Sequence, residues 1–518
     1  MVDQATQGPA GGSGMPGPAG SSAVPGPVAA AGPADVVGPI DPSGVLRELA
    51  NDCVHCGFCL PACPTYLLWG EEMDSPRGRI HLIGQILDGT PGTSAAAAHL
   101  DRCLGCMACV PACPSGVRYD RLIEAARSWA EEPPAGAPPL PPRSRRERAA
   151  RAAIFATFPY PRRLRPLLAP LRVAQRTGLD RVLARTGLAG RLSPELAAAL
   201  RVAPAPAPAR RTPARFLRDG RTHDGPPRDG GARDGGARDG RLPGRIPAAG
   251  TRRAVVGMLT GCVQQVFFPQ VNAATARVLA AEGCDVIIPA GQGCCGALSL
   301  HGGRRTEAAR FARRIIAEFE RAGVDAIVVN AAGCGSAMKE YGELLAGDGG
   351  WAPRAAALSG KVRDFTEFLA GLGPAAVRHP LPVSAAYHDA CHLGHAQQIT
   401  AQPRALLRAI PGLELAEVPD GSTCCGSAGI YNLVQPEAAR ELGERKASAI
   451  EKTGAQLLVS ANPGCSLQIS AALAARGSRL PMAHVAEVLD ASIRGAGVSE
   501  LLGARGSAPT RPERRRAQ

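Results

Sequence analysis

Residues 53–64 read CVHCGFCLPACP, and residues 103–114 repeat the same spacing as CLGCMACVPACP. Both runs have the pattern CxxCxxCxxxCP, in which three thiolates on one tight loop can each bind an iron atom of a cubic cluster. The fourth iron needs a ligand from elsewhere, and the last cysteine of the other run can supply it. The two runs therefore predict a domain that holds a pair of 4Fe-4S clusters.

This crossover assigns four cysteines to each cluster. The predicted sets are Cys53, Cys56, Cys59 and Cys113 for one cluster, and Cys103, Cys106, Cys109 and Cys63 for the other. Zinc is the alternative metal, but structural zinc sites usually have two CxxC pairs separated by a dozen or more residues. Clusters of the predicted kind accept and pass single electrons, which favours an electron carrier.

A helix is predicted between the two runs, over SPRGRIHLIGQILDG (75–89). Ser75 is a suitable N-cap, Pro76 suits the first helical position, and Gly89 follows an apolar stripe of isoleucines. Arg77 and Arg79 lie on this helix. They are interpreted either as solvated side chains or as charges that raise a cluster's potential or contact a partner.

The positive charge of the chain is concentrated in one segment. Residues 143–253 contain 26 Arg against 8 Asp and Glu, within a net charge of +14, and this segment is rich in proline and glycine. Aromatic residues make up only 4% of the chain, so a nucleic-acid-binding face is not expected. Residues 145–202 are predicted to be helical, as a strap on the chain's own domains or as a peripheral contact with an anionic membrane.

The amino-terminal sequence MVDQATQGPAGGSG does not resemble a signal peptide, and no apolar run of 18 residues occurs. We therefore expect a cytoplasmic protein, either free or peripheral on the inner face of the cytoplasmic membrane. In a reducing compartment, 17 cysteines indicate metal or redox chemistry rather than disulfides.

An internal repeat begins at residue 254. Each copy is predicted to contain three strands alternating with helices, with a cysteine after the first strand, Cys-Cys-Gly after the second and Gly-Cys after the third. Because parallel strands present their carboxyl ends on one side, the four thiols of each copy should converge. The sets are Cys262, Cys294, Cys295 and Cys334 in the first copy, and Cys391, Cys424, Cys425 and Cys465 in the second.

These motifs carry a resemblance. The repeats resemble the CCG-domain family, and the order of dicluster unit and two CCG domains is similar to that of glycolate oxidase iron-sulfur subunits, through CVHCGFC, SPRGRI, LDRCLGC, CPSGVRY, NAATARVL, GCCGA, KEYG and CCGSAGIY. The resemblance covers most of residues 43–490. It implies a mostly α-helical dicluster ferredoxin-type domain followed by two α/β domains with largely parallel sheets.

The resemblance also implies a function. We expect a non-catalytic subunit that passes electrons from FAD-containing partner subunits, which oxidise glycolate to glyoxylate, toward the quinone pool or another acceptor. No flavin fingerprint and no catalytic constellation of side chains was found in the sequence. Related lactate, other 2-hydroxy-acid or anaerobic glycerol-3-phosphate dehydrogenases are alternatives, and a zinc-stabilised scaffold protein is an alternative of another class.

The sequence departs from the fuller CCG pattern, in which the last cysteine belongs to CxxC. The corresponding positions are Ala337 and Gln468, so a fifth cysteine ligand is missing from each copy. A further iron-sulfur cluster, zinc or unliganded thiols remain as alternatives for the two sets. His388, His392 and His395 surround Cys391 and could ligate a metal, although packed or solvated imidazoles are the simpler interpretation.

The expected domain organisation follows from these patterns. The predicted segments are a disordered tail (1–40), the dicluster domain (41–131), a basic connector (132–250; helical over 145–202, then low in complexity), the first CCG domain (251–380), the second CCG domain (381–495) and a disordered tail (496–518).

Overall fold

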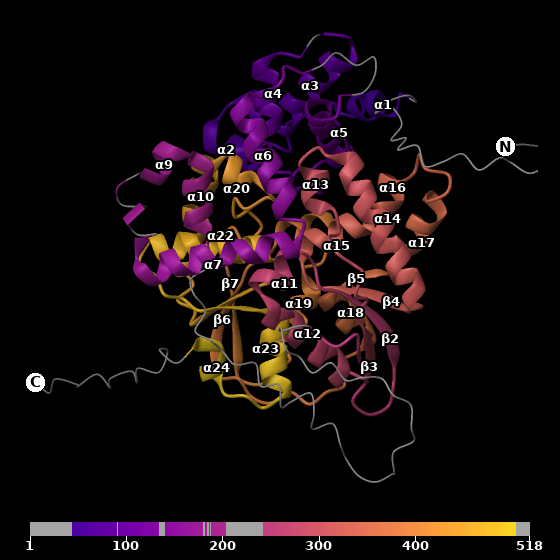
Figure 1. Cartoon of the computed structure of the whole chain (residues 1–518), viewed down its shortest axis with the longest axis vertical. Helices are drawn as coiled ribbons and strands as arrows, with labels where there is room; N and C mark the ends of the chain where they lie inside the picture. Colours follow the sequence, from indigo (N-terminus) through magenta and orange to yellow (C-terminus); the bar gives the residue numbers. More distant parts are fainter. Residues whose placement is uncertain are drawn as a thin grey trace, which may run out of the picture. The chain divides into compact units, whose positions relative to one another are not determined.

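The structure is a computed structural model (Figure 1) that describes residues 44–90, 92–133, 140–179, 182–183, 186, 188–203 and 242–503. The predicted tail 1–40 lies outside the described residues, as do most of the low-complexity part of the connector and residues 504–518.

The amino-terminal domain is built from short helices around the two cysteine runs. Its elements are α1 (Val45–Asn51), α2 (Pro64–Trp69), the 3-10 turn η1 (Glu72–Asp74), α3 (Pro76–Leu87), α4 (Ser94–Asp101) and α5 (Tyr119–Glu131). Helix α3 begins as predicted, because the Ser75 hydroxyl accepts a hydrogen bond from the Gly78 N–H at 3.1 Å. Its isoleucines pack against buried side chains of α1 and α5, such as Leu46 and Leu122.

The connector is mostly helical over the described residues of 145–202. Its helices are α6 (Arg145–Thr157), α7 (Pro161–Thr177), α9 (Leu188–Leu192) and α10 (Pro194–Val202). Phe155 of α6 is 1% exposed and packs with Ala198 of α10 and with Ile430 and Leu433 of the second repeat. This packing supports the strap interpretation for α6 and α10, whereas Leu167 and Val173 of α7 are exposed.

The first repeat forms a five-stranded sheet in the order β1-β3-β2-β4-β5, in which only β1 is antiparallel to its neighbour. Its elements are β1 (Arg245–Ile246), β2 (Ala254–Leu259), α11 (Val263–Phe267), α12 (Pro269–Ala281), β3 (Cys284–Ile287), α13 (Ala297–His301), α14 (Arg305–Ala322), β4 (Ala326–Val329), α15 (Ala332–Lys339), α16 (Tyr341–Leu344), α17 (Ala352–Lys361), β5 (Val362–Asp364) and α18 (Phe365–Leu372).

The second repeat forms an all-parallel sheet in the order β7-β6-β8-β9, which matches the order β3-β2-β4-β5 of the first. Its elements are β6 (Val383–Tyr387), the π-helical turn η2 (His392–Ala396), α19 (Ala401–Arg408), β7 (Leu413–Glu417), α20 (Tyr431–Val434), α21 (Pro436–Glu451), β8 (Leu457–Ser460), α22 (Pro463–Ala475), β9 (Met482–His484), α23 (Val485–Ile493) and α24 (Val498–Leu502). The predicted α/β class with largely parallel sheets is confirmed.

The two repeats share one hydrophobic core, which contains Val256 and Val328 of the first sheet and Ala385 and Leu458 of the second. Helices α12 and α23 pack against each other within it. The loops after β4 and β8 also meet, because the Ala332 N–H donates to the Ala461 carbonyl at 3.2 Å. The fourth cysteine of each set, Cys334 or Cys465, lies just beyond this contact.

Two predicted boundaries need correction. Strand β1 lies inside the predicted connector (132–250), because Arg245 and Ile246 pair with β3 of the first repeat. Helix α24 lies inside the predicted tail (496–518) and packs against the shared core. The Gly-Cys after the third strand of each copy lies in the first turn of a helix, with Cys334 in α15 and Cys465 in α22.

Candidate iron-sulfur centres

The first predicted set of cysteines lines one pocket at the surface of the amino-terminal domain. Cys53, Cys56, Cys59 and Cys113 all lie in its wall, together with Arg77. Cys113 and Cys109, which also lines this pocket, come from the second run. Within the predicted set, Cys56 is exposed, and the other three are partly buried.

The second predicted set is buried. Cys63, Cys103, Cys106 and Cys109 are each at most 8% exposed. Burial raises the pKa of the Cys106 and Cys109 thiols well above the usual value. At Cys103 burial also acts to raise the pKa, but the nearby charges of Arg79 and Arg127 lower it overall. These arginines therefore favour the thiolate, which is the form that binds metal.

The two runs share an unusual backbone conformation. Residues 55 and 57 in the first run, and residues 105 and 107 in the second, all have positive φ. Two of the four, His55 (φ 54°) and Met107 (φ 60°), are not glycine, and the left-handed region costs such residues about 1–2 kcal/mol. The equivalent positions in both loops therefore accept strain, as is common where a loop shapes a binding site.

Arg79 is fully buried between the two runs, which excludes the solvated interpretation for this residue. Its Nε donates to the His99 carbonyl at 2.7 Å, and its Nη atoms donate to Thr65 Oγ1 at 3.2 Å. Arg79 Nη2 also lies 3.3 Å from Asp74 Oδ1, so that the charge is paired. Arg77 differs, because it is partly exposed and pairs with Glu72.

The thiols of the first repeat converge as expected. The Sγ atoms of Cys262 and Cys294 are 3.5 Å apart, and Cys295 interacts with both Cys294 and Cys334. Hydrogen bonds to Cys294 and Cys334 lower the pKa of Cys295, whereas hydrogen bonds to Cys262 and Cys295 raise that of Cys294. Thiols spaced in this way can share a metal, because two thiolates on one tetrahedral ion are about 3.8 Å apart.

The thiols of the second repeat also converge. The Sγ atoms of Cys391 and Cys424 are 3.9 Å apart, and Cys425 interacts with Cys424 and Cys465. Gly426 has φ +85°, and a Cβ at this position would lie 2.7 Å from the Ala439 carbonyl. The glycine of the CCG motif is therefore required for the close approach of this loop to α21.

The second-repeat thiols contact the buried set of the amino-terminal domain. Cys106 and Cys424 belong to one apolar cluster with Leu104 and Tyr431. Negative charge on Cys391 contributes to the raised pKa of Cys106, second only to burial. In addition, His392 Nε2 lies 2.9 Å from the Gly105 carbonyl. This contact was not predicted, since no motif shows which of two repeats lies beside a separate domain.

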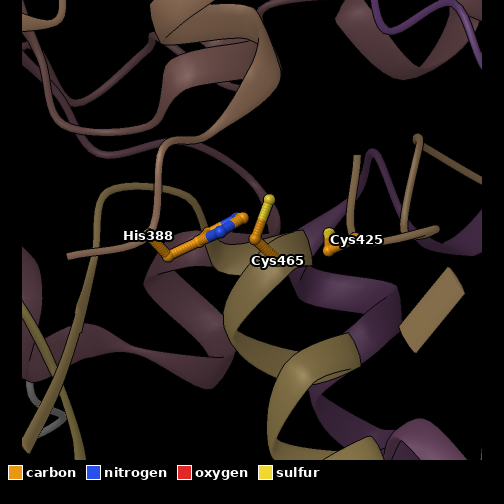
Figure 2. A group of neighbouring side chains, drawn as sticks. All are labelled: His388, Cys425 and Cys465. Atoms are coloured by element: carbon orange, nitrogen blue, oxygen red, sulfur yellow. The ribbon is translucent and has the colours of Figure 1, made fainter. Parts of the chain in front are cut away.

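The three histidines near Cys391 have different surroundings. His395 Nε2 lies 2.8 Å from the Ser422 carbonyl, and His392 Nε2 contacts the Gly105 carbonyl. His388 is 1% exposed and lies beside Cys425 and Cys465, with its ring pointing toward Cys465 (Figure 2). Burial, with a smaller contribution from Lys446, lowers the pKa of His388 to about 3, which keeps the imidazole neutral.

Comparisons with known proteins agree with this architecture. The 4Fe-4S dicluster domain family matches residues 49–117, and the cysteine-rich domain family matches residues 256–339 and 385–470. The family described as the linker region of the glycolate oxidase iron-sulfur subunit matches residues 146–203. The fold and its cysteines therefore define an iron-sulfur protein of the electron-transfer class.

Curated relatives show the particular family. The chain is 36% identical to the probable glycolate oxidase iron-sulfur subunit of Bacillus subtilis (strain 168), over 85% of this chain and 93% of the relative. It is 34% identical to the glycolate oxidase iron-sulfur subunit of Escherichia coli (strain K12), over 88% and 96%. The chain belongs to the family of glycolate oxidase iron-sulfur subunits.

A second group of relatives matches part of the chain. Lactate utilization protein A of Shouchella clausii (strain KSM-K16) is 33% identical over 45% of this chain and 98% of its own length.

Proposed function

We propose that this protein is the electron-transfer subunit of a glycolate-oxidising complex, in which FAD-containing partner subunits convert glycolate to glyoxylate. The observation that carries the proposal is that Cys113 of the second run lines one pocket with Cys53, Cys56 and Cys59 of the first, in a chain that belongs to the glycolate oxidase iron-sulfur family. A 4Fe-4S cluster, bound in each set, would take up and release single electrons.

The chain's own residues would place these redox groups in a defined arrangement. The set with Cys56 lies at the surface, where a partner can approach. The set with Cys106 is buried and contacts the thiols of the second repeat. Arg79 and Arg127 add positive charge beside the buried set, and such charge favours reduction. We propose a further iron-sulfur cluster or zinc in the repeat sites.

The loop around the exposed set is a suitable docking surface for the flavin subunit. Val54 and Phe58 flank Cys56 in the sequence and are 69% and 66% exposed. Large apolar side chains at such exposure are typical of interaction sites when they lie together. We infer that this loop contacts the partner, because it brings the exposed thiols close to whatever binds there.

Helix α7 would contact the membrane that holds the quinone acceptor. It contains five arginines and no acidic residue, and Leu167 and Val173 are at least half exposed. This composition fits an anionic lipid surface. No helix in the described ranges is both long and apolar enough to cross a membrane. Co-sedimentation with anionic but not neutral vesicles, lost when Leu167 and Val173 become serine, is the expected result.

Oxidation of lactate is the second candidate, favoured by the similarity of half the chain to lactate utilization proteins. The iron-sulfur chain alone is expected to oxidise neither acid. Reconstitution with glycolate oxidase flavin subunits, assayed with glycolate and lactate in turn, distinguishes the two candidates.

Iron and sulfide analysis of anaerobically purified protein tests the proposal directly. We expect about eight irons and eight sulfides from the two amino-terminal sets, with additional metal if the repeat sites are filled. A Cys294→Ser/Cys424→Ser variant should keep these eight and lose only the additional metal. A colourless protein that contains zinc but no labile sulfide would favour a scaffold protein and overturn the proposal.

A further inference from the structure

His388 is a buried imidazole with no hydrogen-bond partner on either ring nitrogen among the described residues. An unpaired buried polar atom costs about 1–3 kcal/mol, so two on one side chain require an explanation. Other buried histidines differ in this respect. His484 uses both nitrogens, with Asn330 O and the Ala486 N–H, and His301 uses one, with Glu124.

The surroundings of His388 indicate what the imidazole is for. One ligand atom each from His388, Cys425 and Cys465 lie within 4.8 Å of one another, and all three residues are buried. They come from three places in the fold: the loop after β6, the loop after β7 and the first turn of α22 (Figure 2). The backbone N–H of His388 donates to the Val459 carbonyl at 2.9 Å, which fixes the residue beside β8.

The position that would supply a fifth cysteine offers no replacement ligand. Gln468 stands there, and its amide is already engaged, because its Nε2 donates to the Ala439 carbonyl at 2.8 Å and its Oε1 accepts from Asn432 at 3.2 Å. His388 lies beside the same set of thiols. It precedes the first cysteine of the set, Cys391, by three residues, whereas Gln468 follows the last, Cys465, by three.

The two repeats differ at this position. The residue three places before Cys262 is Leu259, which is buried in the core of the first repeat. The first site therefore has four thiols with a leucine at this sequence position, whereas the second has four thiols with an imidazole. Zinc and iron-sulfur centres both accept a mixture of thiolate and imidazole ligands.

We propose that His388 is a ligand of a metal centre held by Cys391, Cys424, Cys425 and Cys465, so that the second site is a nitrogen–sulfur site and the first an all-sulfur site. The inference deepens the proposed function, since it assumes that the second site holds metal. If the centre is an iron-sulfur cluster, the imidazole raises its reduction potential relative to that of an all-cysteine site, as histidine ligands do in Rieske centres.

The test begins with wild-type protein, labelled with ¹⁵N-histidine and purified anaerobically, and therefore needs no variant to fold. If the second site holds iron, pulsed electron paramagnetic resonance should show a strongly coupled histidine nitrogen. If it holds zinc, zinc-edge X-ray absorption should show one nitrogen among the sulfur ligands. Metal in the second site with sulfur ligands alone would overturn the proposal.

Variants supply the second arm. His388→Leu, which copies the first repeat, should lower the affinity for the second-site metal at least tenfold or lower the potential of that centre, and His388→Cys should restore metal content. His395→Ala is the matched control from the same segment and should change neither. If His388→Leu keeps the metal content, spectrum and potential of the wild type, the imidazole is only structural.

The iron content of the two amino-terminal sets shows whether the inference about His388 has failed or the proposed function itself has failed. About eight irons should remain in every variant. If Cys425→Ser keeps the metal content of the wild type, the second site is empty. This result would overturn the inference about His388 but not the proposed electron-transfer function.

Discussion

Single residues near the cysteines decide how the thiols are held. The sequence left Arg77 and Arg79 equivalent, as two arginines on one helix. The structure separates them, because one faces Glu72 at the surface and the other is enclosed between the two runs. The difference arises from the helical period: a shift of two residues turns a side chain to the opposite face.

Replacing Arg79 with leucine should therefore lower the free energy of unfolding by about 3 kcal/mol, because Asp74 would lose one partner of a buried pair. Arg77→Leu is the matched control and should cost less than about 1 kcal/mol, as expected for an exposed ion pair. Urea denaturation of both variants measures the difference. Equal effects would contradict the assigned role of Arg79.

The helices and loops determine which surfaces are available to partners. The loop of the first run exposes Val54 and Phe58, while the loop of the second run is covered by the second repeat through Leu104 and Cys106. Two loops with the same cysteine spacing thus have opposite surroundings. Only one of them can meet a partner directly.

Phe58→Ser should weaken electron transfer from the flavin subunit, raising the apparent KM for that subunit about tenfold without loss of iron. The physical reason is the loss of apolar contact area at the docking surface. Val377→Ser is the matched control, since Val377 is 71% exposed but lies between the two repeats in the sequence. An unchanged KM for Phe58→Ser would exclude this loop as the docking site.

The connector gives a prediction about stability. Phe155→Ala should lower the stability by about 3–5 kcal/mol, because a buried aromatic side chain is removed from between α10 and α20. Leu167→Ala, on the exposed face of α7, should change stability by less than about 0.5 kcal/mol. Comparable thermal midpoints for the two variants would contradict the strap interpretation.

The whole molecule brings carboxylates of different domains together. Glu340 lies near Glu124, Asp120 and Glu343, where the amino-terminal domain meets the first repeat. Burial and these neighbouring charges raise the pKa of Glu340 to about 8, and mainly burial raises that of Glu124 to about 7. The folded protein therefore binds protons here that the unfolded chain has released.

Stability should consequently fall as the pH rises from about 6 to 8, since the folded state, in which the pKa values of Glu340 and Glu124 are about 8 and 7, binds more protons than the unfolded state in this window. Glu340→Gln imitates the protonated carboxyl group and should flatten the decrease, which urea midpoints at several pH values measure. Glu441→Gln, in an exposed pair with Arg445, is the control and should keep the wild-type slope. A steeper decrease in Glu340→Gln would contradict the assignment.

Local patterns in the sequence were sufficient for helix α3 and for the alternation of strands and helices in both repeats, and they also predict the cysteine sets. These features depend on neighbours in the chain: ligand spacing on a tight loop, a capping serine, and the period of apolar residues. The glycines of the two Cys-Cys-Gly motifs, Gly296 and Gly426, both have a φ of +85°.

Tertiary structure alone decided the relations between distant segments. No local pattern indicates that Cys106 lies against the second repeat rather than the first, that Arg79 is enclosed, or that His388 faces Cys425 and Cys465. The physical reason is that burial and contact depend on which surfaces the packed domains cover. The sequence by itself determined which thiols could bind metal, and only the packing of the domains decided what surrounds them.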